Sequence, residues 1–385
     1  MDVSGANFLR QGSEKARRDE LLLHRIRRHG PITFADFMET CLYHPEHGYY
    51  TRNISRQAAG DYYTSPDVHP IFGRLLARQF REMWEILGCP RAFHLVEFGA
   101  GQGTLAATVL DWIEGNAPEF ARALRMLLVE RSPCLRQLGE QRLAGRLAGQ
   151  VRWAAELGET PVVGCFYSNE LVDAFPVHRV VQRHAGLREI YVAASGDELN
   201  EQEGELSSPA LADYLAQYGA PLAQGQQAEV GLQALAWLEQ VAAGLAQGFV
   251  LTIDYGYLAS ELYSAARPAG TLLAYRRHRV SDALLAGPGL QDLTAHVNFT
   301  ALIEHGRKLG LLPCGYTTQT KFLLALGKKS EFADLYAPDA SEAQRYKARL
   351  QLKQLIYPEG MGETFKVLVQ AKGLTTVSLT GLGSF

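Results

Sequence analysis

The pattern of apolar and polar positions predicts that strands and helices alternate over the middle and the end of the chain. Short apolar runs predict seven strands, at Phe93 to Glu97, Met126 to Glu130, Val151 to Trp153, Pro161 to Ser168, Gly248 to Tyr255, Leu311 to Gln319 and Phe365 to Gln370. Apolar residues at helical spacing predict helices over Phe72 to Leu87, from Leu232 to a stop at Gly248, and over Phe299 to Leu309. This alternation indicates a parallel sheet with helices on both faces.

The N-terminal part of the chain has a different pattern. A helix is predicted over residues 14–29, and a loop-rich stretch with many aromatic residues follows it. A first insertion into the sheet contains two β-type runs around Ala185-Gly186 and an acidic tip at 196–205. We therefore predict a helical and loop-rich cap and one larger domain with two insertions, with bounds of 1–90 for the cap, 91–385 for the domain, and about 177–227 and 256–298 for the insertions.

A glycine loop separates the first predicted strand from a helical pattern, which is the usual form of a nucleotide-cofactor site. A dinucleotide-binding loop has its last glycine where Thr104 stands here, so the details favour S-adenosylmethionine (SAM) over NAD. Glu97 precedes the first glycine by two residues, and its charge suits the sulfonium cation and the amino group of SAM. A tight turn without a cofactor is the alternative. The loop residues are Gly99, Ala100, Gly101, Gln102 and Gly103.

Further carboxylates follow the strands at the edge where open parallel sheets bind ligands. Glu130 ends the second strand and is predicted to accept hydrogen bonds from the ribose hydroxyls of the cofactor, with a solvated acid as the alternative. Asn169, Glu170 and Asp173 follow the fourth strand, next to the expected position of the transferable methyl group. Paired carboxylates can orient a guanidinium and localise a lone pair on one nitrogen. Alternatively, Asn169 lines the methionine part of SAM and the two acids cap the following helix.

Three histidines fall near candidate loops, where one could act as a general base near neutral pH. They are His44, His178 and His296. Most of the 11 histidines are expected to be structural, and His296 is the candidate base.

Composition excludes several classes of protein. The 385 residues are 47% hydrophobic and 21% charged, with a net charge of −3, so nothing points to nucleic acid or an anionic membrane surface. The five cysteines are scattered, which argues against disulfides and a metal site. No apolar run approaches the roughly 20 residues of a membrane span. Acids at Glu14, Asp19 and Glu20 lie among the N-terminal arginines, which argues against a transit peptide and favours a cytoplasmic location.

A series of short motifs occurs in one order from residue 30 to about 369. They are Gly30-Pro31-Ile32, Leu42-Tyr43-His44-Pro45, Gly48-Tyr49-Tyr50, Gly60-Asp61, Thr64-Ser65-Pro66, Glu97 to Gly103, Asn169-Glu170, Asp173-Ala174, Asp254-Tyr255-Gly256, Gly270-Thr271-Leu272, Thr294-Ala295-His296-Val297, Met361-Gly362-Glu363 and Phe365-Lys366-Val367. In these motifs the chain resembles the MidA-like SAM-dependent methyltransferases, which include the mitochondrial complex I assembly arginine methyltransferase and bacterial relatives.

The resemblance implies a class I (Rossmann-like) α/β methyltransferase fold with a seven-stranded, mostly parallel sheet. It also implies protein arginine ω-N methylation. Mitochondrial members of the family are linked to symmetric dimethylation of a complex I subunit. Glu170 and Asp173 would face the substrate. The residues that would bind or cover SAM are Glu97, Gly99, Ala100, Gly101, Gly103, Glu130, Thr64, Ser65 and Pro66. Departures from the family pattern at Tyr62, Gln102, Leu171 and Phe175 leave the cofactor loop intact and put the shape of the substrate pocket in question.

The leading hypothesis is an enzyme that transfers methyl from SAM to an arginine of a protein substrate, with a homodimer as one form of assembly. One alternative is a small-molecule N- or O-methyltransferase. A second is a non-catalytic SAM-binding assembly factor. An NAD-dependent oxidoreductase is the weakest option.

Overall fold

The structure is a computed structural model that describes residues 21–52, 65–276, 279–357 and 360–383. The chain forms two compact units, each built from three separate segments. Unit 1 consists of Met1–Tyr62, Asp173–Ala234 and Tyr257–Thr300. Unit 2 consists of Tyr63–Val172, Leu235–Gly256 and Ala301–Phe385.

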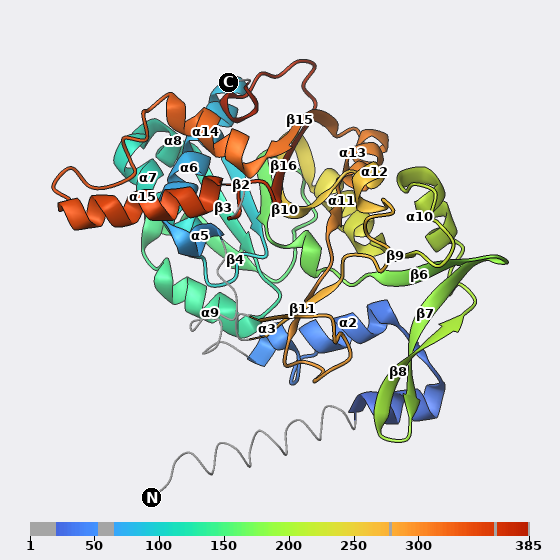
Figure 1. Cartoon of the computed structure of the whole chain (residues 1–385). Helices are drawn as coiled ribbons and strands as arrows, with labels where there is room; N and C mark the ends of the chain where they lie inside the picture. The colour runs from blue at the N-terminus through green and yellow to red at the C-terminus, as the bar shows by residue number, and fades with distance from the viewer. Residues whose placement is uncertain (1–20, 53–64, 277–278, 358–359, 384–385) are drawn as a thin grey trace, which may run out of the picture. The chain divides into compact units, whose positions relative to one another are not determined.

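Strands and helices alternate along much of the described chain (Figure 1). The strands are β1 Ile32–Thr33, β2 Phe93–Phe98, β3 Leu124–Val129, β4 Val151–Ala154, β5 Val162–Asn169, β6 His178–Arg183, β7 Gly186–Ser195, β8 Glu198–Gly204, β9 Gln227–Val230, β10 Leu245–Tyr257, β11 Leu273–Arg276, β12 Arg279–Ser281, β13 Asp292–Thr294, β14 Val297–Asn298, β15 Leu312–Thr318 and β16 Phe365–Lys372. The helices are α2 Phe34–Tyr43, α3 Tyr49–Arg52, α5 Ser65–Val68, α6 Ile71–Ile86, α7 Thr104–Asn116, α8 Pro118–Ala123, α9 Pro133–Arg142, α10 Ala210–Tyr218, α11 Leu232–Gly244, α12 Ala259–Leu262, α13 Phe299–Lys308, α14 Gln319–Lys328 and α15 Glu342–Ile356, with 3₁₀ turns η1 Arg146–Gly149, η2 Val172–Ala174 and η3 Thr380–Leu382.

Unit 2 is built on a sheet in which seven strands follow the order β15-β16-β10-β5-β2-β3-β4. The strands from β10 to β4 run parallel, whereas β16 is antiparallel to both of its neighbours. The chain order reverses between β2 and β5, and this switch point is where ligands bind in open α/β sheets. The predicted mostly parallel α/β sheet is confirmed, and the seven strands on this path belong to a sheet of eight.

Helices pack on both faces of this sheet. Phe80 of α6 lies on Tyr167 of β5, with the ring centroids 4.8 Å apart. Trp237 of α11 lies on Phe98 of β2, with the centroids 5.8 Å apart. Because Phe98 pairs with Ser168, the residue after Tyr167, the side chains of Phe98 and Tyr167 point to opposite faces. Helices therefore cover both faces of the sheet, which leaves the edge strands and the strand ends as the places where a ligand can bind.

Helix α11 ends at Gly244 and not at the expected stop, Gly248. Gly248 lies inside β10 with φ +137°, and a Cβ atom there would lie 1.9 Å from the backbone oxygen of Gly164 on β5. The glycine thus permits two strands to approach closely, which a sequence pattern does not distinguish from a helix stop.

Unit 1 contains a second, antiparallel sheet in the order β1-β7-β6-β9, with β8 on β7. The two β-type runs around Ala185-Gly186 are the hairpin of β6 and β7, as expected. The expected acidic tip at 196–205 is instead mostly strand β8, and two of its carboxylates pair with arginines of β6. Arg179 pairs with Glu201, and Arg183 pairs with Glu203.

Part of the stretch expected to be loop-rich is the helix α2. The Thr33 hydroxyl accepts the backbone N–H of Asp36 at 3.0 Å and caps the start of this helix. The buried residues follow helical spacing and enter the apolar core of unit 1, and they are Phe34, Phe37, Met38, Cys41 and Leu42. This helical spacing is not recognised in the sequence analysis, because the stretch is classified there by its many aromatic residues and turn formers. Residues 21–29 are helical, and the rest of the predicted helix over 14–29 lies outside the described residues.

The division into units differs from the expected boundary at residue 90. Helix α6 precedes that boundary but belongs to unit 2, because Phe72 and Phe80 share one apolar core with Phe93. The later segments of unit 1 span 173–234 and 257–300. Among the described residues, no helix combines the length and apolar character that a bilayer span requires.

Candidate functional site

The glycine loop joins β2 to α7 in unit 2. Gly99, Gly101 and Gly103 have φ values of +68°, +54° and +72°, a region in which other residues are strained. Gly103 is the N-cap of α7. Apart from its chain neighbours, no atom of the described residues lies within 4 Å of a Cβ atom built at Gly101, so this part of the structure leaves space beside the loop. The backbone N–H groups of Gly99 and Ala100 both donate to the Val129 oxygen, at 2.9 and 3.3 Å, and anchor the loop to β3.

Glu130 follows β3 and is tied to the glycine loop. Its Oε2 accepts the backbone N–H of Gly101 at 3.0 Å, and its Oε1 accepts that of Ser132 at 2.8 Å. Burial raises the pKa of Glu130, and the two backbone hydrogen bonds oppose that rise. The structure therefore brings the acid expected to bind ribose directly to the loop expected to bind the rest of the cofactor.

Glu97 is buried near the end of β2, with 5% of its surface exposed. The Tyr167 hydroxyl donates to its Oε2 at 2.7 Å. Burial raises the pKa of Glu97 to about 8, although the bond from Tyr167 lowers it. Glu97 therefore retains its proton at neutral pH in the protein alone, and a cation beside it would favour the charged form that the sequence led us to expect.

Glu170 follows β5, the strand that pairs with β2 at the switch point. Its backbone is left-handed, with φ +52°, and its N–H donates to the Ile253 oxygen at 3.0 Å. Its Oε1 accepts the backbone N–H of Ser65 at 2.9 Å and the side-chain N–H of Asn169 at 3.0 Å. The Oδ1 of Asn169 is buried and has no hydrogen-bond partner among the described residues. This atom is an acceptor available to a ligand that carries an N–H or O–H group.

Asp254 caps the turn that follows Glu170. Its Oδ2 accepts the N–H groups of Leu171 and Val172 at 3.2 and 2.9 Å, and its Oδ1 accepts the N–H of Tyr255 at 2.9 Å. In the sequence analysis Asp254 stands only as part of a quoted motif, with no role of its own. Because Asp254 supplies these capping bonds, the carboxylate of Glu170 is directed elsewhere, to Ser65 and Asn169.

The segment expected to cover the cofactor is described only from Ser65 onward, and Thr64 lies outside the described residues. Ser65 begins α5 and is fully buried, with its hydroxyl 3.3 Å from Gln319 Oε1. Pro66 is half-buried in the same short helix. The described contact of this segment with the candidate site is the bond from the Ser65 N–H to Glu170.

Asp173 and His296 belong to unit 1. The Asp173 side chain is buried, and its backbone oxygen accepts the N–H of Ala295 at 2.9 Å. The N–H of His296 donates to the Thr271 hydroxyl at 3.1 Å, and the His296 ring lies 5.3 Å from the ring of Tyr257. Within unit 1, residue 173 and the segment at 294–296 are therefore neighbours.

Unit 1 also contains aromatic and acidic residues to which the sequence gave no role. The Tyr50 hydroxyl donates to Asp292 Oδ1 at 2.8 Å, and the Tyr43 hydroxyl donates to the Ala174 oxygen at 2.9 Å. Burial raises the pKa of Tyr50, and the charges of Asp292 and Asp173 raise it further. These tyrosines stand in two of the quoted motifs, which was the signal that could have identified them.

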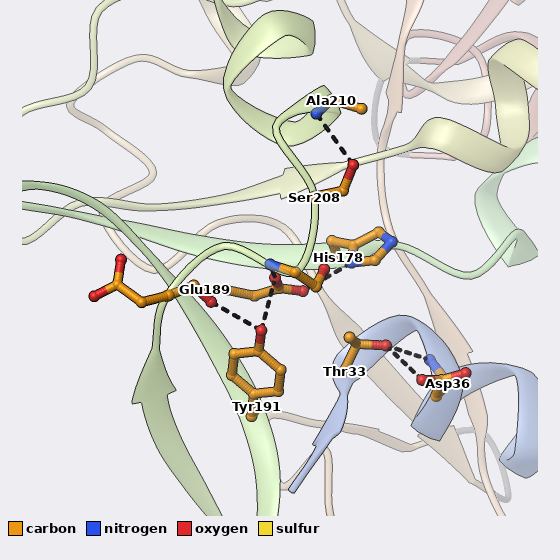
Figure 2. A network of polar contacts seen from close by, with 9 residues as sticks. Thr33, Asp36, His178, Glu189, Tyr191, Ser208 and Ala210 are labelled. Carbon is orange, nitrogen blue, oxygen red and sulfur yellow. Dashed lines mark hydrogen bonds and ion pairs between the residues drawn. The ribbon is translucent and has the colours of Figure 1, made fainter.

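The other two histidines have structural roles. Figure 2 shows His178 beside Glu189, with 2.8 Å between Nδ1 and Oε1. Burial alone would raise the pKa of Glu189, but hydrogen bonds from His178 and from the Ser207 backbone N–H outweigh it and lower the pKa. His44 Nδ1 accepts the N–H groups of Glu46 and His47, each at 3.2 Å, and closes a turn. Among the described residues, no group of three or more metal-ligating side chains is placed to hold a metal ion.

The residues of unit 2 fit SAM. The open space beside Gly101 leaves room for a ligand at the loop. Glu130 presents carboxylate oxygens to ribose hydroxyls, and the orphaned Oδ1 of Asn169 presents an acceptor to an amino group. Glu97 is a buried acid whose ionisation a cationic ligand would stabilise.

Comparison with known proteins agrees with this fit. Residues 75–317 match the family described as "Putative S-adenosyl-L-methionine-dependent methyltransferase". A Burkholderia thailandensis protein solved with bound S-adenosyl-homocysteine is 31% identical, with a TM-score of 0.85 over 96% of this chain and 95% of that one. The chain is 29% identical to the zebrafish Danio rerio "Protein arginine methyltransferase NDUFAF7, mitochondrial" over 88% of this chain and 82% of the relative. The human protein of that name is 28% identical over 89% and 81%.

These relatives correct one expectation from the sequence. The zebrafish, human and fruit fly proteins are all named as mitochondrial, which contradicts the predicted cytoplasmic location. That prediction depended on three acids near the N-terminus. Three charged residues are too few to determine the cellular compartment of a protein. The expected fold, cofactor and enzyme class are confirmed, and the chain belongs to the MidA-like family of S-adenosyl-L-methionine-dependent methyltransferases.

Proposed function

We propose that the protein transfers a methyl group from SAM to a guanidinium nitrogen of an arginine in a protein substrate. The observation that carries the proposal is the fixed carboxylate of Glu170 at the switch point of the sheet, where Ser65 and Asn169 hold its Oε1. The name of the relatives, protein arginine methyltransferase, supports the same substrate class.

The cofactor would be held by the glycine loop and the acids around it. In this proposal Glu130 accepts the ribose hydroxyls, Gly101 leaves room for the ligand, and Glu97 balances its positive charge. Ser65 and Pro66 belong to the segment that covers it. Bound SAM supplies an electrophilic methyl group on a positively charged sulfur.

The guanidinium presents a specific difficulty, because its pKa is above 12 and its lone pairs are delocalised. A carboxylate that accepts two N–H bonds orients the plane of the group and offsets its charge. We assign this role to Glu170 of unit 2, and Asp173 of unit 1 is a second candidate carboxylate for it. Asn169 aligns Glu170 through its side-chain amide, and His296 is the candidate for removing the proton that methylation releases.

Transfer of labelled methyl from SAM into a protein extract tests the proposal, with wild type compared with Glu170→Gln. The glutamine retains an acceptor for the Ser65 N–H but lacks the charge, so we expect at least a 100-fold loss of transfer, equivalent to about 3 kcal/mol. SAM affinity, measured separately by calorimetry, should stay within a few-fold of wild type. Acid hydrolysis of the labelled protein should yield methylarginine.

Other outcomes would favour the alternatives. Label in small molecules only would indicate a small-molecule methyltransferase. Equal labelling by wild type and Glu170→Gln would remove Glu170 from the mechanism. SAM binding without transfer to any acceptor would favour a non-catalytic assembly factor. The expected homodimer stays a prediction, which light scattering of the purified protein tests.

A further inference from the structure

A cluster of tyrosines and acids lies in unit 1, and Asp173 is its one member to which the proposed function gives a role. We define it as the Tyr50–Asp292 cluster, which consists of Tyr43, Tyr50, Asp173, Tyr275, Asp292 and Thr294. Its members come from three distant parts of the chain, and several of them stand in the motifs quoted above. We propose that this cluster binds the guanidinium group of an arginine side chain.

The small sheet of unit 1 places three members of the cluster on one face. In the β11–β13 ladder Tyr275 pairs with Asp292, and Ala274 pairs with Leu293. Ala274 and Leu293 are fully buried in the apolar core of unit 1. Because side chains alternate along a strand, Tyr275, Asp292 and Thr294 share the opposite face. This face is partly exposed at Tyr275 and Asp292.

The α2–α3 region and the chain at 173 complete the cluster. The Tyr50 hydroxyl donates to Asp292 Oδ1 at 2.8 Å, and the rings of Tyr43 and Tyr50 lie 5.5 Å apart. Residue 173 lies beside the other members, because its backbone oxygen accepts the N–H of Ala295 at 2.9 Å and the oxygen of the next residue, Ala174, accepts the Tyr43 hydroxyl at 2.9 Å. The cluster thus combines two carboxylates with three aromatic rings.

A buried hydroxyl gives independent evidence for a ligand. Thr294 is 4% exposed, and its Oγ1 has no hydrogen-bond partner among the described residues. A buried polar atom without a partner is costly unless something binds it. The strand register directs this hydroxyl to the same face as the Asp292 carboxylate. A ligand that carries several N–H donors would satisfy it.

A guanidinium meets these requirements better than other cations. It is planar, carries five N–H donors in a fixed fork, and stacks on aromatic rings through cation–π attraction. Two carboxylates and a hydroxyl can accept its donors while the tyrosines cover its faces. A lysine ammonium has no plane to stack and only three donors. The inference rests on the proposed function, since it places the arginine of the substrate in this cluster.

Binding of a small arginine compound tests the inference without an identified protein acceptor. The probe is N-acetyl-arginine methylamide, added to the full-length protein saturated with S-adenosyl-homocysteine and followed by saturation-transfer NMR. The matched control is the citrulline counterpart, which has the same shape and no charge. We expect a clear signal from the arginine compound and none from the citrulline compound. Equal signals from the two, or from the lysine counterpart, would overturn the assignment.

Two variants locate the binding. Asp292→Asn should weaken binding of the arginine compound by about tenfold or more, the usual effect of losing a charge-assisted hydrogen bond. Thr294→Val should weaken it by about threefold without lowering the melting temperature, because the hydroxyl has no partner to lose. Asp282→Asn changes an exposed acid of the same segment outside the cluster and should have no effect.

The outcomes separate this inference from the proposed function. Unchanged binding in Thr294→Val and Asp292→Asn overturns the cluster assignment and leaves the methyl-transfer result untouched. Should Asp292→Asn fail to fold, Thr294→Val decides alone, because it preserves side-chain shape. Binding at the cluster in a protein that makes no methylarginine would instead refute the proposed function.

Discussion

Replacing Glu97 by glutamine is expected to stabilise the protein at neutral and alkaline pH. In the folded protein, burial raises the pKa of this carboxyl from 4.5 to about 8, and in the unfolded chain it titrates near the ordinary value. Between these two values the folded state keeps a proton that the unfolded state releases. The contribution of Glu97 to stability therefore declines as the pH rises from about 4.5 to about 8, and it is constant above that.

The size of the effect follows from the pKa difference. At about 1.4 kcal/mol per pKa unit, the rise from 4.5 to about 8 corresponds to a cost of about 5 kcal/mol in alkaline solution. Relaxation of the folded protein around the charge reduces this value, so we expect Glu97→Gln to be more stable than wild type by about 2 to 5 kcal/mol at pH 9. At pH 5 the gain should be at most about 1 kcal/mol. Glutamine keeps an oxygen to accept the hydroxyl of Tyr167.

Urea unfolding followed by circular dichroism at pH 5, 7 and 9 measures the difference. Glu140→Gln is the control, because Glu140 is exposed on α9 and its replacement should give a difference that is small at every pH. The test is the change of the wild-type-to-variant difference with pH and not the stability at one pH. If that difference stays constant from pH 5 to pH 9, the reasoning about burial of Glu97 is wrong.

The same carboxyl gives a test of cofactor placement. A bound ligand with a positive amino group near Glu97 would draw the proton off the carboxyl. Binding of S-adenosyl-homocysteine at pH 7 should then release close to one proton, and calorimetry in two buffers of different ionisation enthalpy measures it. Glu97→Gln should bind without this release. Equal proton release by the two proteins would place the amino group away from Glu97.

Three further predictions follow from particular contacts. Gly101→Val should abolish the rise in melting temperature that SAM causes, because the valine side chain fills the open space and strains a left-handed backbone by about 1–2 kcal/mol. If SAM raises the melting temperature of the variant as much as that of wild type, the placement of the cofactor is wrong. Thr252→Val should raise the free energy of unfolding by about 1 kcal/mol, since the buried hydroxyl has no hydrogen-bond partner among the described residues. Urea unfolding measures this difference, and a lower unfolding free energy in the variant would show that the hydroxyl does have a partner. Glu189→Gln should lower the free energy of unfolding at pH 7. The loss should become smaller as the pH falls through the lowered pKa of Glu189, because protonation of the wild-type carboxylate removes the same charge. An equal loss of unfolding free energy at pH 3 and pH 7 would contradict this pH dependence.

The central sheet could be predicted from the sequence because interior parallel strands are apolar on both faces. Strand β5 is an example, with a buried run from Gly164 to Ser168 that stands out in any hydropathy pattern. Strand β8 is the opposite case. Its side chains are mostly polar, so no apolar pattern marks it as a strand. Its glutamates can form ion pairs with Arg179 and Arg183 only once β6 lies beside β7 in the folded sheet.

The candidate site was partly predictable for the same reason. The glycine loop and Glu130 are near each other in a fold whose strand order is known, so their meeting could be expected. The Tyr50–Asp292 cluster could not, because Tyr50, Asp173 and Asp292 lie in three separate segments with no repeated spacing. The raised pKa of Glu97 was also unpredictable, since it depends on how far burial outweighs the opposing hydrogen bond from Tyr167 in the folded protein.

The position of β16 has a consequence for how the protein is made. This strand pairs with β10 over 248–255 on one side and with β15 on the other, yet it is the last strand in chain order. While the chain emerges from the ribosome, β10 presents an apolar, unpaired edge until residue 372 has left the exit tunnel. An open edge of this kind is a template for pairing with another nascent chain. The protein is therefore most exposed to aggregation in the interval between the synthesis of β10 and the synthesis of β16.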